Sequence, residues 1–166
     1  MRNTRYHVED MLLRTAQNWP DADTAVNRLV NRLFRLHDLI LEDSSKEMAR
    51  FDISPVEFTV LSSLRKLAPP HEMRPSELYN AMLVTSGGMT KILKSLDARK
   101  LVERIPDPND GRGIRVRLTA TGAALIEEVM EAVQASQAMM LAKAADPSAI
   151  VTLADSLAAF TSVLDR

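Results

Sequence analysis

The sequence predicts a mainly helical protein that carries one small β-hairpin. Over most of the chain, apolar residues recur three and four positions apart, which is the period of an amphipathic helix. The period changes once, near residue 101, where apolar and polar residues alternate in two short runs. With 166 residues, 46% of them hydrophobic and 26% charged, the chain has an ordinary globular composition and enough length to bury a core.

The composition and the first residues exclude several classes of protein. There is no cysteine, which excludes a disulfide, a thiolate nucleophile and a cysteine-ligated metal. His7, His37 and His71 are too scattered for a metal site, and no metal or cofactor is expected. No uninterrupted apolar run is as long as a membrane span, and charges interrupt the region where a signal peptide needs an apolar stretch. We therefore expect a cytoplasmic protein that does not bind membranes.

Two helices are predicted in the first fifty residues. Residues 4–18 form a short helix, which ends near Pro20 because the residue before a proline disfavours helical geometry. A long helix follows from about Asp23 to Met48, and its apolar residues share one face through spacings of three and four.

The middle of the chain predicts three more helices. Ser54 is placed as the N-cap, Pro55 as the first helical residue and Glu57 as the partner that completes a capping box. This helix is expected to end before the Pro69-Pro70 pair. A short helix over 75–83 and a longer one over 85–100 follow it.

A two-stranded hairpin is predicted next. Residues 101–105 and 114–118 alternate between apolar and polar, as strands with one buried face do. The segment 106–113 is dense in Pro, Gly, Asn and Asp, and because it is longer than a tight turn we expect it to project as a loop. Two further helices, over 119–145 and 148–164, complete the chain.

Charge is distributed unevenly along a chain whose net charge is −1. Residues 85–118 contain eight basic and four acidic side chains, a net charge of +4, whereas residues 119–166 have a net charge of −4. A local basic segment predicts a polyanionic partner for that segment. Three helices followed by a hairpin are also the element order of a winged helix-turn-helix, in which the third helix enters the major groove of DNA. The basic segment is the part that this architecture brings to double-stranded DNA, with helix 85–100 in the major groove and wing 102–118 at the minor groove.

Several motifs resemble the MarR (multiple antibiotic resistance regulator) family. They are Pro75-Ser76-Glu77-Leu78, the run Thr85-Ser86-Gly87-Gly88-Met89-Thr90, and the wing sequence Asp110-Gly111-Arg112 with Leu118-Thr119 six residues later. The resemblance implies a homodimeric transcription regulator whose DNA affinity is changed by a small molecule. The helix that precedes the long helix, together with the Ser-Gly-Gly-Met-Thr segment, is similar to the urate-responsive branch of the family.

The resemblance also implies three regions. Residues 1–50 hold the N-terminal helix and the long dimerisation helix, residues 51–120 form the winged helix-turn-helix, and residues 121–166 form the C-terminal dimerisation helices. A dimer of this kind is expected to bind a pseudo-palindromic operator, as a repressor of its own or a neighbouring gene.

The predicted DNA contacts come from the third helix and the hairpin. Hydroxyl groups and free N–H groups at a helix start suit phosphate oxygens, and a guanidinium suits a narrow minor groove. The resemblance further implies that Asp110 forms an ion pair with Arg112 and so shapes the wing. The alternative for the helix is a solvated face, and for Arg115 and Arg117 a solvated strand edge. The residues predicted to bind DNA are Ser86, Gly87, Thr90, Lys91, Lys94, Arg112, Arg115 and Arg117.

An effector pocket is predicted between the dimer helices and the winged region. The urate-responsive branch uses a Trp, an Asp and two Arg residues, of which only Arg104 is cleanly retained, because Thr59 and Ile92 replace two of the others. A different effector, an aromatic acid or a phenol, is therefore expected. The alternatives are a structural anchor for the tryptophan and a hydrogen-bonded core or interface residue for the histidine. The pocket residues are Trp19, His37, Phe51, Phe58 and Arg104.

Two other classes of function fit the sequence less well. An enzyme is disfavoured because the chain has no Gly-x-Ser-x-Gly, Walker or His-Glu-x-x-His motif. A helical protein-interaction module that kept the winged fold without DNA binding is the alternative. Such a module typically replaces its basic residues, whereas this chain retains Lys91, Lys94 and Arg112.

Overall fold

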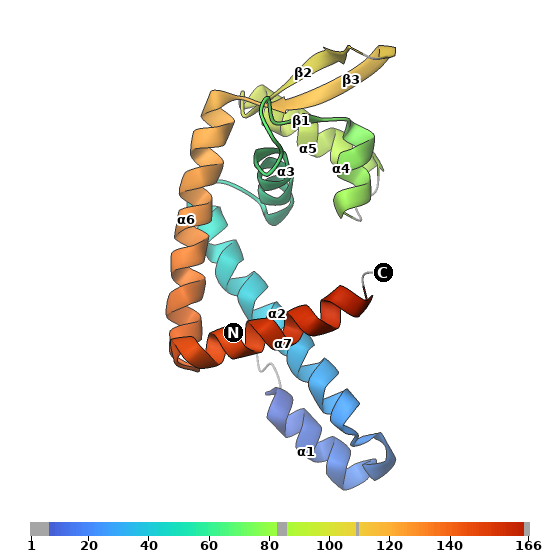
Figure 1. Cartoon of the computed structure of the whole chain (residues 1–166), viewed down its shortest axis with the longest axis vertical. Coiled ribbons are helices and arrows are strands. Elements are labelled where there is room, and N and C mark those ends of the chain that lie inside the picture. Colours follow the sequence, from blue (N-terminus) through green and yellow to red (C-terminus); the bar gives the residue numbers. More distant parts are fainter. Residues whose placement is uncertain (1–6, 83–85, 109, 165–166) are drawn as a thin grey trace, which may run out of the picture. The chain divides into compact units, whose positions relative to one another are not determined.

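A computed structural model of the chain describes residues 7–82, 86–108 and 110–164 (Figure 1). It divides into two compact units, one up to Asp43 and one from Ser44 onwards, so the long helix α2 (Ala25–Arg50) contributes to both. The structure is mainly helical with a small β-sheet, as the sequence predicts.

The first unit contains α1 (Val8–Asn18), a 3-10 turn η1 (Pro20–Ala22) and the first part of α2. The predicted break at Pro20 is confirmed, since α1 ends at Asn18 and Pro20 begins the 3-10 turn. Residues 4–6 of the predicted first helix lie outside the described residues. Arg32 of α2 donates two hydrogen bonds of 2.9 and 2.8 Å to Glu9 of α1, which joins the two helices by a bidentate ion pair.

Large apolar side chains of the first unit remain uncovered within the single chain. Trp19 is 68% exposed and Phe34 66% exposed. The amphipathic spacing of α2 therefore creates an apolar face whose partner is not supplied by the residues that the structure describes. Other large apolar residues on the exposed surface of α2 are Val26, Leu29, Val30, Leu33, Leu39 and Leu41.

In the second unit, α3 (Pro55–Arg65) begins with the capping box that the sequence predicts. The Ser54 hydroxyl accepts a hydrogen bond from the Glu57 N–H, and the Glu57 carboxylate accepts one from the Ser54 N–H at 3.0 Å. The next helices are α4 (Pro75–Met82) and α5 (Ser86–Ala98). Leu83 and Thr85, which the sequence places at the ends of these helices, lie outside the described residues.

The sheet has three antiparallel strands in the order β1-β3-β2, rather than the two predicted. They are β1 (Glu72–Met73), β2 (Val102–Asp107) and β3 (Asp110–Leu118). The prediction of a long projecting loop over 106–113 is wrong, because pairing continues to Asp107 opposite Asp110, with an irregularity between Pro106 and Asp107. A proline is accommodated in β2 because β2 is an edge strand, where a missing N–H removes no ladder bond on the open side.

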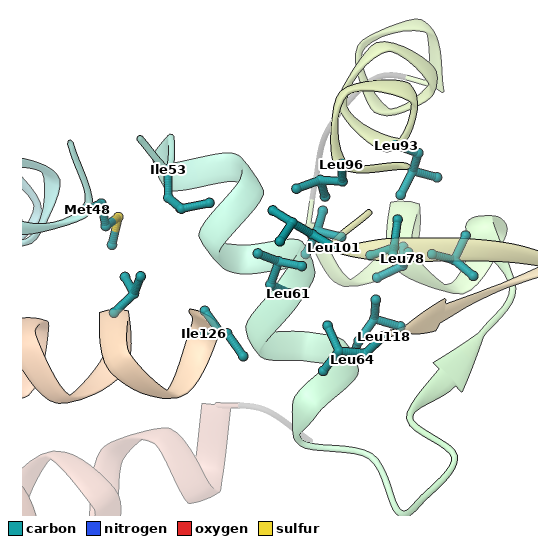
Figure 2. Packing of buried hydrophobic residues seen from close by; sticks show 14 of the residues in the cluster. Met48, Ile53, Leu61, Leu64, Leu78, Leu93, Leu96, Leu101, Leu118 and Ile126 are labelled. Carbon is teal, nitrogen blue, oxygen red and sulfur yellow. The ribbon is translucent and has the colours of Figure 1, made fainter. Parts of the chain in front are cut away.

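The hydrophobic core lies in the second unit, where α3, α4 and α5 pack against one face of the sheet (Figure 1). In Figure 2, side chains from α3, α4, α5 and β3 point into the same interior. They are Leu61 and Leu64 of α3, Leu78 of α4, Leu96 of α5 and Leu118 of β3. Val116 and Leu118 project from β3 into this core, so the alternate residues of β3 project from the opposite face of the sheet. We call this opposite side the outer face.

A single threonine joins the end of α5, both hairpin strands and the start of α6 (Ala120–Ala142). The Thr119 hydroxyl accepts a hydrogen bond from the Gly122 N–H at 2.9 Å, which caps α6, and it contacts the carbonyl oxygens of Lys100 and Leu101 at 2.7 and 3.1 Å. The Thr119 N–H also donates to the Leu101 carbonyl. We call this contact set, made by Lys100, Leu101, Thr119 and Gly122, the threonine joint.

His71 follows two prolines in a loop, and on that basis the sequence predicts exposure to solvent, but the structure shows it half-buried instead. Its Nδ1 lies 2.7 Å from the Leu67 carbonyl oxygen, and its own carbonyl accepts a hydrogen bond from the Leu118 N–H. The prediction fails because the following residues form β1, which brings the loop after the two prolines against β3.

The last two helices differ in burial. Helix α6 buries Ile126, Val129 and Val133, and Gln137 donates a hydrogen bond of 2.9 Å to the Ser44 hydroxyl. By contrast, α7 (Pro147–Leu164) has no buried residue. With 18 residues and a mean hydropathy of 1.4, α7 is long and apolar enough to cross a membrane, by length and composition alone. A search for uninterrupted apolar runs does not detect this helix, because polar residues interrupt it.

Candidate nucleic-acid interface

Helix α5 presents a basic face on the side opposite the core. Met89, Leu93 and Leu96 are buried, whereas Thr90, Lys91 and Lys94 are exposed. Residues three and four apart lie on one side of a helix, so the exposed residues form one surface. Among the described residues, none forms an ion pair with either lysine. The two ammonium groups therefore offer positive charge to an outside partner.

The start of α5 is only partly described. Ser86 is its first residue and Gly87 its second. The surroundings of both residues lie outside the described part of the structure, so their predicted contacts to phosphate remain predictions.

The C-terminal half of α5 is held against the start of α3. Ser95 donates a hydrogen bond of 3.1 Å to Glu57, and Arg99 donates one of 2.8 Å to the carbonyl oxygen of Asp52. Arg99 also lies 3.6 Å from the Glu57 carboxylate. We call this set the α3–α5 brace, and it fixes the position of the basic face relative to the core.

The charge state of Glu57 reflects these contacts. Burial raises the pKa of the Glu57 carboxyl group, but hydrogen bonds from Ser54 and Ser95 and the positive charge of Arg99 outweigh it. The net result is a pKa below the usual value. The capping carboxylate is therefore ionised over a wider range of pH than an ordinary glutamate.

The outer face of the sheet holds Arg115 and Arg117 in ion pairs with carboxylates. Arg117 lies between Glu72 of β1 and Glu103 of β2 in one cross-strand row, at 2.8 and 3.5 Å. Arg115 lies 3.1 Å from the other oxygen of Glu72. The hydrogen bond with Glu72 raises the pKa of Arg117 above its usual value. Both guanidinium groups are therefore already engaged by carboxylates, and any contact with phosphate competes with these ion pairs.

A buried carboxylate completes this arrangement. The Asp107 side chain is fully buried and accepts a hydrogen bond of 2.5 Å from Arg74, while Arg115 approaches it at 3.9 Å. We call the six charged residues the sheet network. Its members are Arg74, Arg115, Arg117, Glu72, Glu103 and Asp107.

The structure contradicts the alternative interpretation of Arg115 and Arg117 as residues of a solvated strand edge, while their predicted contact with DNA stays a prediction. β3 is the central strand, so Arg115 and Arg117 do not lie on a solvated edge. Glu72 was missed because β1 is two residues long, which is too short for an alternating pattern to reveal it. The only signal was its place between a proline-rich turn and the start of α4.

The wing tip is described only in part. Asp110 is exposed at the start of β3, but the Arg112 side chain lies outside the described residues. The predicted ion pair between Asp110 and Arg112 stays a prediction. Gly113 follows in a close-packed position, because a Cβ there would lie about 3.0 Å from Asp110 and 3.1 Å from Asp107.

The predicted pocket residues are divided between the two units. Trp19 and His37 are exposed in the first unit, where the His37 Nδ1 lies 3.6 Å from Asp38. Phe51 and Phe58 pack against the core of the second unit, and Arg104 is exposed on β2. The effector pocket therefore stays a prediction from the sequence.

Two cavities of the second unit are lined by other residues. One of about 290 Å³ lies between α3 and α6, where Arg65 and Glu127 form an ion pair at its rim. One of about 450 Å³ lies at the α3–α5 brace. In the described part of the chain, no group of three or more histidine and acidic residues is placed to hold a metal ion.

Comparison with known proteins gives the family. A model of the MarR family matches residues 51–113, which span α3 to the wing. The multiple antibiotic resistance protein MarR of Escherichia coli is 35% identical over 103 residues, or 62% of this chain and 67% of that protein. The chain belongs to the MarR family. The HTH-type transcriptional regulator PecS of Dickeya dadantii is 29% identical over 124 residues, or 75% of each chain.

Solved MarR-family structures agree with the fold. The crystal structure of apo MarR from Escherichia coli superposes with a TM-score of 0.70 at 31% identity, covering 78% of this chain and 94% of that one. A variant of the same MarR protein in complex with operator DNA superposes with a TM-score of 0.66 at 27% identity, covering 88% and 96%. The winged helix-turn-helix predicted from the element order is thereby confirmed.

Proposed function

We propose that this MarR-family regulator is a homodimer that binds a pseudo-palindromic DNA operator and represses its own or a neighbouring gene in the cytoplasm. The observation that carries the proposal is the exposed lysine face of α5, which is held rigidly by the α3–α5 brace. In a twofold dimer, two such helices about 34 Å apart enter successive major grooves.

The proposed interface consists of the α5 face and the wing. Lys91 and Lys94 supply phosphate attraction, and Thr90 lies beside them on the same face. Ser86 and Gly87 at the helix start and Arg112 in the wing, braced by Asp110, complete the interface. An operator complex of a MarR relative supports this assignment.

Dimerisation is supported by the uncovered apolar faces. No residue of α7 is buried, and α2 exposes a row of large apolar side chains. A second copy of the chain is the partner that the proposal assigns to these faces, and it removes the need for a membrane to cover α7.

The effector proposal extends the sequence prediction. A small aromatic acid or phenol is proposed to shift the dimer between two spacings of its recognition helices. The proposed pocket is lined by Trp19, His37, Phe51, Phe58 and Arg104. The urate-responsive branch remains the proposed nearest relative, with α1 as its extra helix.

The DNA-binding proposal is tested by selecting bound duplexes from a random pool and measuring their affinity by fluorescence anisotropy. We expect sub-micromolar binding to an inverted repeat. Replacing Lys91 and Lys94 together by alanine is expected to weaken binding roughly tenfold or more and to flatten its salt dependence, because two phosphate contacts per protomer are lost.

The matched control is Lys143→Ala, which removes a lysine at the exposed end of α6. It is expected to leave the dissociation constant unchanged. Equal affinity for all duplexes would contradict binding to a specific operator. No measurable binding to any duplex would instead favour the protein-interaction module, which lacks DNA binding.

A further inference from the structure

The sheet network cancels positive charge that the sequence assigns to the wing. Residues 85–118 have a net charge of +4, but Glu72 lies outside that segment and pairs with two of its arginines. Within the network, three arginines face three carboxylates. The six charges of the sheet network therefore sum to zero, whereas no described residue forms an ion pair with Lys91 or Lys94 of α5.

Glu72 occupies the centre of the network. Its Oε1 faces Arg115 and its Oε2 faces Arg117, so a single carboxylate engages both guanidinium groups. The Glu72 side chain is 14% exposed, and the two arginines are 22% and 36% exposed. Pairs this shielded from solvent are screened by salt less than exposed pairs.

We propose that Glu72 is a specificity-determining residue, which restrains Arg115 and Arg117 from phosphate and thereby weakens binding to non-cognate DNA. This inference rests on the proposed DNA-binding function. Glu72 acts through the two arginines and itself touches no DNA.

The physical reason lies in the exchange of ions. An arginine that leaves a carboxylate for a phosphate trades one anion for another, and the abandoned carboxylate must recruit a cation. The counterion release that drives non-specific binding is then largely cancelled. Lysines on α5 have no such partner among the described residues, so the free positive charge stays on the helix that reads base edges.

The test is Glu72→Gln, which keeps the size of the side chain and removes its charge. Affinity for a random duplex and for the selected duplex is measured by anisotropy over a series of KCl concentrations. At low salt, the variant is expected to bind the random duplex roughly three- to tenfold more tightly than the wild type. The slope of log affinity against log salt concentration should become more negative by about one to two per protomer. The ratio of specific to non-specific affinity should fall.

Two comparisons isolate the mechanism. Glu128→Gln, on the exposed surface of α6, adds the same positive charge away from the wing and should leave the slope as in the wild type. Adding Arg115→Gln and Arg117→Gln to Glu72→Gln should return the slope to the wild-type value, which a merely structural role for Glu72 would not produce. Thermal unfolding of each variant checks that the compared proteins are folded.

A slope and a random-duplex affinity for Glu72→Gln equal to those of Glu128→Gln would overturn the inference. The proposed function fails on a different result, which is the absence of any preferred sequence for the wild type. The random-duplex comparison still reports on Glu72 in that case, so the two failures are separable.

Discussion

Gly122 lies in the first turn of α6, at the point where that helix approaches the strand β2. A Cβ at this position would clash with the Leu101 carbonyl oxygen and would lie 3.0 Å from a Leu118 methyl group. The clash with Leu101 is with backbone, so no side-chain rotation relieves it. The position therefore requires glycine for space, even though its backbone φ is not positive.

Gly122→Ala is expected to lower the free energy of unfolding by about 1–3 kcal/mol or more, because the start of α6 must move away from Leu101. Chemical denaturation followed by circular dichroism measures the change. The control is Thr121→Ala at the neighbouring exposed position, for which we expect a change within about 0.5 kcal/mol. Equal stability of Gly122→Ala and the wild type would show that the close approach is not present in solution.

Single residues also mark the limit of what the sequence predicts. The capping roles of Ser54 and Glu57 are local, and the sequence predicts both correctly. Thr119 was expected to be near a helix start, but its bonds to Lys100 and Leu101 depend on residues eighteen and more positions away. Glu72 escapes prediction for the same reason, since its partners are more than forty residues along the chain.

At the scale of elements, the α3–α5 brace makes the free energy of unfolding depend on pH. The pKa of Glu57 is lowered in the folded protein, so the unfolded chain takes up this proton at a higher pH than the folded one. The stabilisation is complete above the ordinary glutamate pKa of about 4.3 and is lost as pH falls through the lowered folded value.

Glu57→Gln is expected to reduce the free energy of unfolding by about 1–2 kcal/mol at pH 7, because it weakens the capping box and the contact with Arg99. The difference from the wild type should shrink as the pH falls from about 4 through the lowered pKa of folded Glu57, because the wild-type carboxylate then becomes protonated too. Urea titrations at several pH values measure both effects. Glu128→Gln serves as the exposed control, and a Glu57→Gln deficit that is constant from pH 7 to pH 3 would contradict the assignment.

Elements with long periodic patterns were predicted well, and elements defined by pairing were not. The helices α2, α3, α6 and α7 begin and end within a few residues of the predicted bounds, because caps and prolines are local signals. The hairpin was predicted, but its strands reach further into the turn region than alternation indicates. β1 has only two residues, so its pairing with β3, and not its own sequence, defines it as a strand.

At the scale of the whole molecule, the uncovered apolar surface is the main property of the single chain. In α7, Leu153 is 51% exposed, Phe160 59% and Leu164 77%. These residues share one side of the helix through spacings of seven and four. A surface of this kind on a globular chain marks an interaction site.

Replacing Leu153 and Phe160 together by glutamate is expected to convert a dimer into monomers, because two charges per protomer would be buried at the interface. Analytical ultracentrifugation measures the mass. The control is Ala158→Glu, on the side of α7 that carries Asp155, which should leave the dimer intact. A dimer that survives the double change would remove α7 from the proposed interface.

The threonine joint has a mechanical consequence. One hydroxyl group connects the end of the reading helix, the two roots of the wing and the first turn of α6. Rotation of α6 would thus move α5 and the wing with it as one rigid body. We expect a conformational change transmitted through α6 to alter the distance between the two DNA-binding regions of the dimer, while each region keeps its internal structure.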